Sequence, residues 1–96
     1  MLDETKRFVC AKDVLFRVLD GEAVLLNLES GTYFGMNEIA TRVWELLNQG
    51  KVIGEIRNAL ADEFEVARDV LEKDLDELFE QLEKRGLVLV GSHPAG

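Results

Sequence analysis

The sequence predicts an α+β domain in which a three-stranded antiparallel sheet is followed by three helices and a short C-terminal strand. Two observations lead to this prediction. Residues 14–36 form short apolar runs separated by turn residues, whereas from residue 37 onward the apolar residues recur at a helical spacing. The chain has 96 residues, a single proline and no low-complexity stretch. We therefore expect one domain over residues 1–96, with its core at about 14–90 and a tail at 91–96.

Two turns divide the first part of the chain into three expected strands. Asp20-Gly21 supplies the positive φ angles of a tight hairpin turn between residues 15–19 and 22–28. A second turn at residues 29–31 leads into a third strand at 32–36. Two short connections in succession imply a meander in sequence order, so the third strand is expected at an edge of the sheet.

Three helices are expected after Met36. The first begins at Asn37, a good N-cap residue, and ends before Gly50. The second covers residues 52 to about 64, the third covers about 67–85, and residues 87–90 are long enough for one short strand. The apolar stripes that we expect in the core are Ile39, Val43, Trp44, Leu46 and Leu47 in the first helix, Ile53, Ile56, Leu60 and Phe64 in the second, and Val70, Leu71, Leu75, Leu78, Phe79 and Leu82 in the third.

The charge balance argues against two classes of partner. The chain has 19 acidic and 11 basic residues, a formal net charge of −8, and no third of the sequence is basic. A nucleic-acid backbone and an anionic membrane surface both favour clustered cations, so neither is expected as a partner. The N-terminus lacks the features of a signal peptide, and no apolar run approaches the ~20 residues that span a bilayer. We expect a cytoplasmic protein.

Residues with catalytic or metal-binding chemistry are few. Cys10 is the only cysteine and His93 the only histidine, which excludes an intramolecular disulfide and a cysteine-based metal cage. The sequence contains neither a nucleophile elbow nor a phosphate-binding glycine loop. We therefore expect no enzymatic activity, no cofactor and no metal.

The most informative segment is residues 31–36, which contains no charge and no proline. Proteins normally protect edge strands with such residues, because unpaired backbone groups invite another strand. Arg17 serves this purpose in the first expected strand, and the third has nothing comparable. Tyr33 and Phe34 must also point to opposite faces, so only one can enter the core. The segment is a candidate for adding a peptide strand, unless residues 87–90 fold back and cover an edge.

The ordered combination of several segments resembles the PqqD-like family. The resemblance starts at residues 26–38 with the sequence LNLESGTYFGMNE, followed by Ala40 and the run VWELL at 43–47. It continues with residues 52–56, with Asp74-Leu75, Leu78-Phe79 and Leu82, and with residues 85–88, and so covers about residues 14–90.

The resemblance implies a winged-helix-like domain that recognises the leader segment of a ribosomally made precursor peptide. In that family the leader adds as a strand to the third strand and lies in a groove against the third helix, and a partner enzyme, often a radical-SAM protein, modifies the peptide. Carried over by position, the peptide-binding residues are Thr32, Tyr33, Phe34, Gly35 and Met36 in the strand, and Val70, Asp74 and Leu78 in the helix.

One departure from the family pattern matters for the pathway. This strand carries Tyr33-Phe34-Gly35-Met36, where the members of the pyrroloquinoline-quinone pathway tend to differ, so we expect a different peptide pathway. We expect the domain to stand alone and not to be fused to an enzyme, so its catalyst is expected to be a separate polypeptide. The resulting hypothesis is a non-catalytic peptide-binding chaperone. A winged-helix regulator that binds nucleic acid is the alternative, and the net charge of −8 argues against it.

Overall fold

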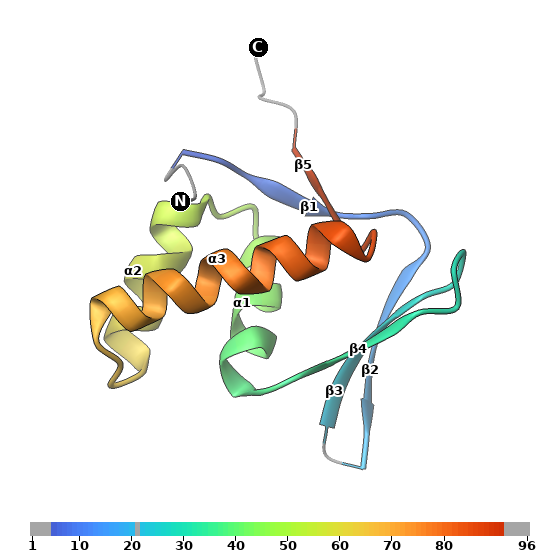
Figure 1. The fold of residues 1–96 in the computed structure, drawn as a ribbon, viewed down its shortest axis with the longest axis horizontal. Coiled ribbons are helices and arrows are strands. Elements are labelled where there is room, and N and C mark those ends of the chain that lie inside the picture. The colour runs from blue at the N-terminus through green and yellow to red at the C-terminus, as the bar shows by residue number, and fades with distance from the viewer. Residues whose placement is uncertain (1–4, 21, 92–96) are drawn as a thin grey trace.

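The computed structural model describes residues 5–20 and 22–91, and it has the predicted α+β architecture (Figure 1). The expected tail beyond Gly91 lies outside the described residues. Each predicted helix is present, with ends within two residues of those expected from the sequence. The elements in chain order are β1 (Phe8–Cys10), β2 (Val14–Leu19), β3 (Glu22–Asn27), β4 (Tyr33–Met36), α1 (Glu38–Asn48), α2 (Ile53–Glu63), α3 (Arg68–Lys84) and β5 (Val88–Val90).

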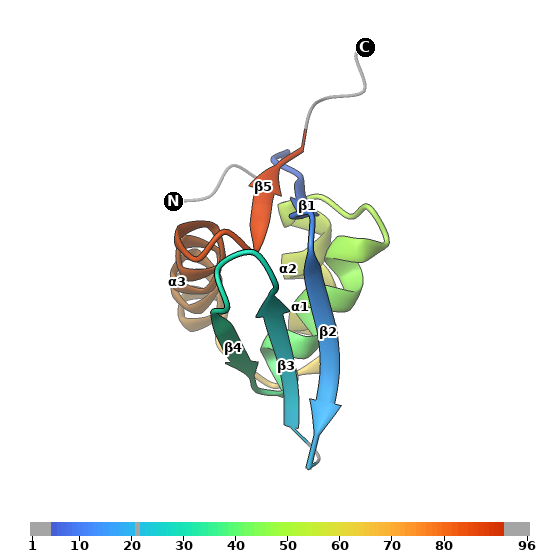
Figure 2. The same ribbon diagram turned by 90° about the vertical axis from the view of Figure 1, so that its right-hand side faces the viewer.

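The three-stranded sheet is the predicted antiparallel meander, in the order β2-β3-β4. At the first turn Asp20 has a φ of 51°, as a tight hairpin requires, and Gly21 lies outside the described residues. At the second turn Gly31 has a φ of 75°. Figure 2 shows β4 at the edge of the sheet that lies toward α3, with β2 at the opposite edge.

A second sheet, of two strands, was only half predicted. β5 pairs antiparallel with β1, with Phe8 opposite Val90 and Cys10 opposite Val88. Strand β1 was not predicted, because three residues are too few to display an alternating pattern. Since β5 pairs with β1, it does not cover the edge of the three-stranded sheet. Within the part of the chain that the structure describes, β4 pairs only with β3.

The core lies between the helices and the inner face of the sheets, as the apolar stripes predicted. Trp44 is 5% exposed, and Phe79 is fully buried and stacks on Phe8 with the ring centroids 4.6 Å apart. The prediction for Val70 was wrong, because its side chain is 48% exposed. The core-facing line of α3 passes through Leu71, Leu75, Phe79 and Leu82, and Val70 precedes that line by about 100° around the helix.

The ends of α1 and α3 show the expected capping. The side-chain oxygen of Asn37 accepts a hydrogen bond from the N–H of Ala40 at 2.8 Å and so caps α1. Gly86 follows the C-cap of α3 with a φ of 70°, a conformation that glycine adopts without strain. None of the helices in residues 5–20 and 22–91 is long and apolar enough to cross a membrane.

Candidate peptide-binding site

The backbone of β4 presents hydrogen-bonding groups at a free edge. The N–H of Asn27 donates to the carbonyl of Thr32 at 2.8 Å, which makes these two residues a hydrogen-bonded pair across β3 and β4. In an antiparallel ladder such pairs alternate with non-bonded pairs. Phe34 and Met36 therefore exchange bonds with β3, where they face Leu25 and Ala23. The N–H and C=O groups of Tyr33 and Gly35 point to the open edge.

The side chains of β4 alternate between the two faces of the sheet. Met36 is buried, Phe34 is half-buried against the core, and both point toward the helices. Tyr33 is 66% exposed on the outer face, on which Gly35 also lies. The two adjacent aromatic residues are thus divided between the core and solvent, as the sequence predicted. Thr32 lies just before β4, with its hydroxyl 2.9 Å from that of Ser30.

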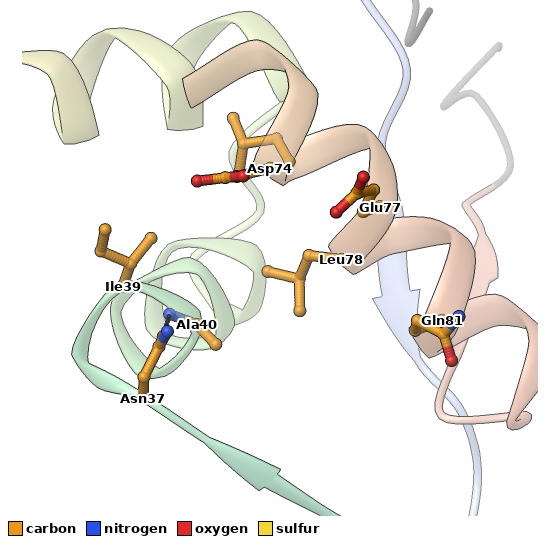
Figure 3. Close-up of a pocket in the computed structure, with 8 residues that line it drawn as sticks. Asn37, Ile39, Ala40, Asp74, Glu77, Leu78 and Gln81 are labelled. Atoms are coloured by element: carbon orange, nitrogen blue, oxygen red, sulfur yellow. Dashed lines mark hydrogen bonds between the residues drawn. The ribbon is translucent and has the colours of Figure 1, made fainter. Parts of the chain in front are cut away.

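A hollow of about 350 Å³ lies between the first turn of α1 and the middle of α3 (Figure 3). Asp74 and Leu78, two of the three helix residues expected from the sequence, line it. Val70 lies one turn before Asp74 and is not among the lining residues, so its contact with a peptide stays a prediction. Figure 3 shows Leu78 and Ile39 on facing helices, with the apolar side of the hollow between them. The lining residues are Asn37, Ile39, Ala40, Asp74, Leu75, Glu77, Leu78 and Gln81.

The edge of β4 and this hollow are continuous in space. Asn37 follows β4 directly, caps α1 and lines the hollow, so the strand leads into it. At the other end of β4, the guanidinium of Arg85 lies 5.6 Å from the centroid of the Phe34 ring. Arg85 is the C-cap of α3, so this cation–π contact joins the inner face of β4 to that helix. Asn37 and Arg85 thus link the two ends of β4 to the hollow and to α3, and the strand edge and α3 are the two sides of the groove that we expect.

The groove is acidic at the α3 side of the hollow. Asp74 and Glu77 both line it, and among the described residues neither has an ion-pair partner. No basic side chain is among the lining residues. An extended peptide with a basic residue in this part of the groove would fit the charge of these two carboxylates.

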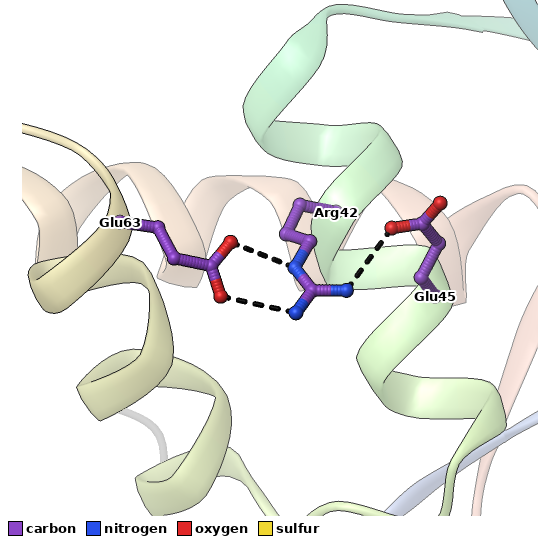
Figure 4. A network of polar contacts seen from close by, with 3 residues as sticks. All are labelled: Arg42, Glu45 and Glu63. Atoms are coloured by element: carbon purple, nitrogen blue, oxygen red, sulfur yellow. Dashed lines mark hydrogen bonds and ion pairs between the residues drawn. The ribbon is translucent and has the colours of Figure 1, made fainter.

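Two carboxylates outside the hollow, Glu45 on α1 and Glu63 on α2, are paired with an arginine instead. Arg42 binds Glu63 through two hydrogen bonds of 2.8 and 3.0 Å and reaches Glu45 at 3.2 Å (Figure 4). The hydrogen bonds to Glu63 and then Glu45 raise the pKa of Arg42, and the bond from Arg42 lowers the pKa of Glu63. The network joins α1 to α2, and so supports the helix whose first turn forms one wall of the hollow.

Cys10, the only cysteine of the chain, lies half-buried at the end of β1. The thiol of Cys10 donates to the side-chain oxygen of Asn48 at 2.7 Å, and burial raises its pKa, which opposes formation of the nucleophilic thiolate. No group of three or more His, Cys, Asp or Glu residues is arranged to hold a metal in residues 5–20 and 22–91. His93 lies outside these ranges.

Sequence reasoning found the strand and part of the helix wall, and it missed the contribution of α1. Asn37 was predicted as a helix cap and Ile39 as a core residue, and both also line the hollow. Ala40, Glu77 and Gln81 were not singled out. Glu77 and Gln81 could have been found from their spacing, because they lie three and seven residues after Asp74 on α3.

A family model described as coenzyme PQQ synthesis protein D (PqqD) matches residues 22–88. The chain belongs to the PqqD family. The match spans the sheet from β3 onward, all three helices and the start of β5, so it includes both sides of the groove. No curated protein sequence matches the chain.

Two solved structures of other proteins share this fold over nearly the whole chain. One is TbiB1 in complex with the TbiA(beta) leader peptide, with 33% identity and a TM-score of 0.75 over 92% of this chain and 98% of that one. The other is lasso peptide synthetase B1 complexed with the leader peptide, with 28% identity and a TM-score of 0.78 over 86% of this chain and 98% of that one. Both are leader-peptide complexes by their descriptions.

Proposed function

We propose that this PqqD-family protein is a non-catalytic chaperone that binds the leader segment of a ribosomally made precursor peptide. The observation that carries the proposal is the free edge of β4, where Tyr33 and Gly35 present unpaired backbone groups beside the groove at α3. Backbone groups of this kind hold an extended peptide by adding it to the sheet. The two solved relatives described as leader-peptide complexes support the same class of ligand.

The bound leader would lie as a fourth strand beside β4 and continue toward the hollow between α1 and α3. Its backbone would bond to Tyr33 and Gly35, which gives affinity with little dependence on sequence. Side chains on its inner face would meet Phe34 and Leu78, and those near Asp74 would meet negative charge. Hydrogen bonds between β4 and the peptide backbone would supply affinity, and contacts with the helix wall would supply selectivity.

The modifying enzyme would be a separate polypeptide that receives the bound peptide, in the cytoplasm where precursor peptides are made. One of the two solved relatives is described as lasso peptide synthetase B1, and the other as TbiB1 in complex with a leader peptide. The first description favours the machinery of lasso peptide synthesis over a radical-SAM enzyme as the class of partner. A leader chaperone needs no catalytic group of its own.

A nucleic-acid-binding role has no support in the helix that would have to carry it. In winged-helix regulators a helix of the domain enters the major groove and needs basic residues for the phosphates. The sequence of α3, RDVLEKDLDELFEQLEK, has seven acidic and three basic residues. Its exposed surface would repel a phosphate backbone.

Amide hydrogen exchange with a synthetic leader peptide tests the proposal, and the peptide is chosen by searching the neighbouring genes for a short precursor. The peptide should protect the amides of Tyr33 and Gly35, because a new strand supplies their acceptors. It should leave those of α2 nearly unchanged. Protection of the β2 edge (Val14–Leu19) in place of β4 would show that the peptide binds elsewhere.

A further inference from the structure

Neither the backbone conformation nor the packing of this chain requires glycine at position 35, although Gly35 lies inside a strand. Glycine in a strand is destabilising relative to alanine, because it loses more conformational freedom on folding. Gly35 is not in the left-handed region of φ, so its backbone conformation does not require glycine. A Cβ atom built on it would meet nothing within 4 Å. Packing within the chain does not require glycine either.

The missing side chain opens a gap in the outer face of the sheet. Tyr33, two residues earlier on the same face, stands as an exposed aromatic wall, and beyond it β4 presents bare backbone at Gly35. Across the sheet Gly35 faces Val24, and Tyr33 faces Leu26. A shallow apolar hollow of about 480 Å³ lies beside Tyr33 on this face, and Arg17, Leu19, Asp20, Glu22, Val24, Leu26, Gly31 and Tyr33 line it.

A strand that binds to β4 would place one side chain directly at this gap. The N–H and C=O groups of Gly35 point to the free edge, so one residue of a strand added antiparallel would exchange both hydrogen bonds with it. The side chain of that residue would emerge on the outer face, because directly opposed residues share a face. Neighbouring strands lie about 4.8 Å apart, a distance that an aromatic side chain can span.

We infer that Gly35 and Tyr33 form a specificity-determining subsite that takes an aromatic side chain of the bound leader peptide. The inference rests on the proposed strand addition at β4. The ring lies across the backbone of Gly35, where cross-strand aromatic residues are known to compensate for a glycine at a sheet edge. Its edge meets the ring of Tyr33, which is exposed and free to form an aromatic pair. A glycine inside a strand often marks such a close approach by a ligand.

The substrate class follows from this arrangement. The leader would carry Phe, Tyr or Trp at the position opposite Gly35, and the residues on either side of it would point inward to the groove at α3. Two independent surfaces would then read the peptide, the α1–α3 hollow on the inner face and the Gly35–Tyr33 subsite on the outer face.

The test is a coupling measurement with selected peptides. Phage-displayed random 12-residue peptides are selected on the full-length protein, and those that protect the Tyr33 and Gly35 amides are kept. We expect an aromatic residue opposite Gly35, and its replacement by Ala should weaken binding about three- to tenfold, as for an aromatic pair. In the Gly35→Val protein this loss should nearly disappear, because the gap is filled. Leu15→Val, on the same face at the far edge and outside the hollow beside Tyr33, is the matched control and should retain the full loss.

Each outcome decides the inference. Suppose that the peptides protect the β4 amides, but replacing their aromatic residue by Ala weakens binding to Gly35→Val as much as it weakens binding to the parent. That result would overturn the inference, while the proposed function would stand. Peptides that never protect those amides would overturn strand addition at β4 and the inference together. Gly35→Val is expected to fold, because its side chain meets open space and valine favours strands, and its melting temperature checks this.

Discussion

The side-chain nitrogen of Asn27 lies 3.3 Å from the carbonyl oxygen of Gly86, and this contact ties the turn after β3 to the C-terminal end of α3. The same nitrogen lies 3.4 Å from the carbonyl of Arg85. The side-chain oxygen of Asn27 accepts from the N–H groups of Glu29 and Ser30 and so shapes the turn into β4. One buried amide thereby fixes both sides of the candidate groove relative to each other.

Replacing Asn27 by Ala should lower the free energy of unfolding by about 1–3 kcal/mol, because buried backbone groups lose their partner. The residue is 7% exposed, so water replaces these bonds poorly. Urea denaturation followed by circular dichroism measures the effect. Ser30→Ala, in the same turn but exposed, serves as the control and should cost much less. Equal losses in the two variants would show that the Asn27 bonds contribute little.

Trp44→Ala should destabilise the protein by about 3–5 kcal/mol, as other large-to-small changes in cores do. The side chain is 5% exposed on the apolar face of α1, so its removal leaves a cavity. Chemical denaturation gives the difference. Leu28→Ala, at a position that is 54% exposed, should change the stability by a small fraction of that amount. An unaltered denaturation midpoint for Trp44→Ala would mean that the tryptophan does not support the core.

The parts of the molecule that the sequence predicted are those with local signals. Helix α3 shows its apolar period over 17 residues, and Asp20 and Gly31 mark their turns by residue type. Strand β1 has no such signal. Its pairing depends on β5, with Phe8 opposite Val90 at the other end of the chain, so only the tertiary fold defines it.

In the candidate site, too, one part has a local sequence signal and another part depends on the tertiary fold. The edge strand was found because residues 31–36 lack the charges that normally protect an edge, and this is a local property. The wall at α1 was missed, because Asn37 and Ile39 reach α3 only when the two helices pack together. Val70 shows the limit of a periodic pattern, since a residue at the border of the apolar stripe can lie on either side of it.

The Arg42–Glu63 pair predicts a pH dependence of stability. Its hydrogen bond lowers the pKa of Glu63 in the folded protein below the usual value of 4.5. A carboxylate of this kind stabilises the folded state above its usual pKa, and the contribution is lost as the pH falls through the folded-state pKa. Glu63→Gln should therefore lower the melting temperature at neutral pH, and the difference from the parent should close on acidification.

The control for that experiment is Glu65→Gln, a nearby exposed carboxylate outside the Arg42 network. It should leave the melting temperature nearly unchanged across the same pH range. A Glu63→Gln deficit that persists at pH values where the carboxylate is protonated would assign the effect to packing and not to the ion pair.

The last prediction concerns the helix side of the groove. Asp74→Lys should weaken leader binding at least several-fold by cancelling the negative charge of the hollow, and Leu78→Trp should do so by filling it. A loss of about 1.4 kcal/mol corresponds to a tenfold weaker complex, which isothermal titration calorimetry with the leader peptide resolves. Both variants should keep nearly the parent melting curve, because Asp74 is exposed and Leu78 is only half-buried. Glu80→Lys makes the same charge change on α3 outside the hollow and should bind almost as the parent does, since exposed charges at a distance are screened by salt. If all three variants bind the leader with the affinity of the parent, the peptide does not lie against α3. The predicted contact with α3 would then be wrong, even if strand addition at β4 is correct.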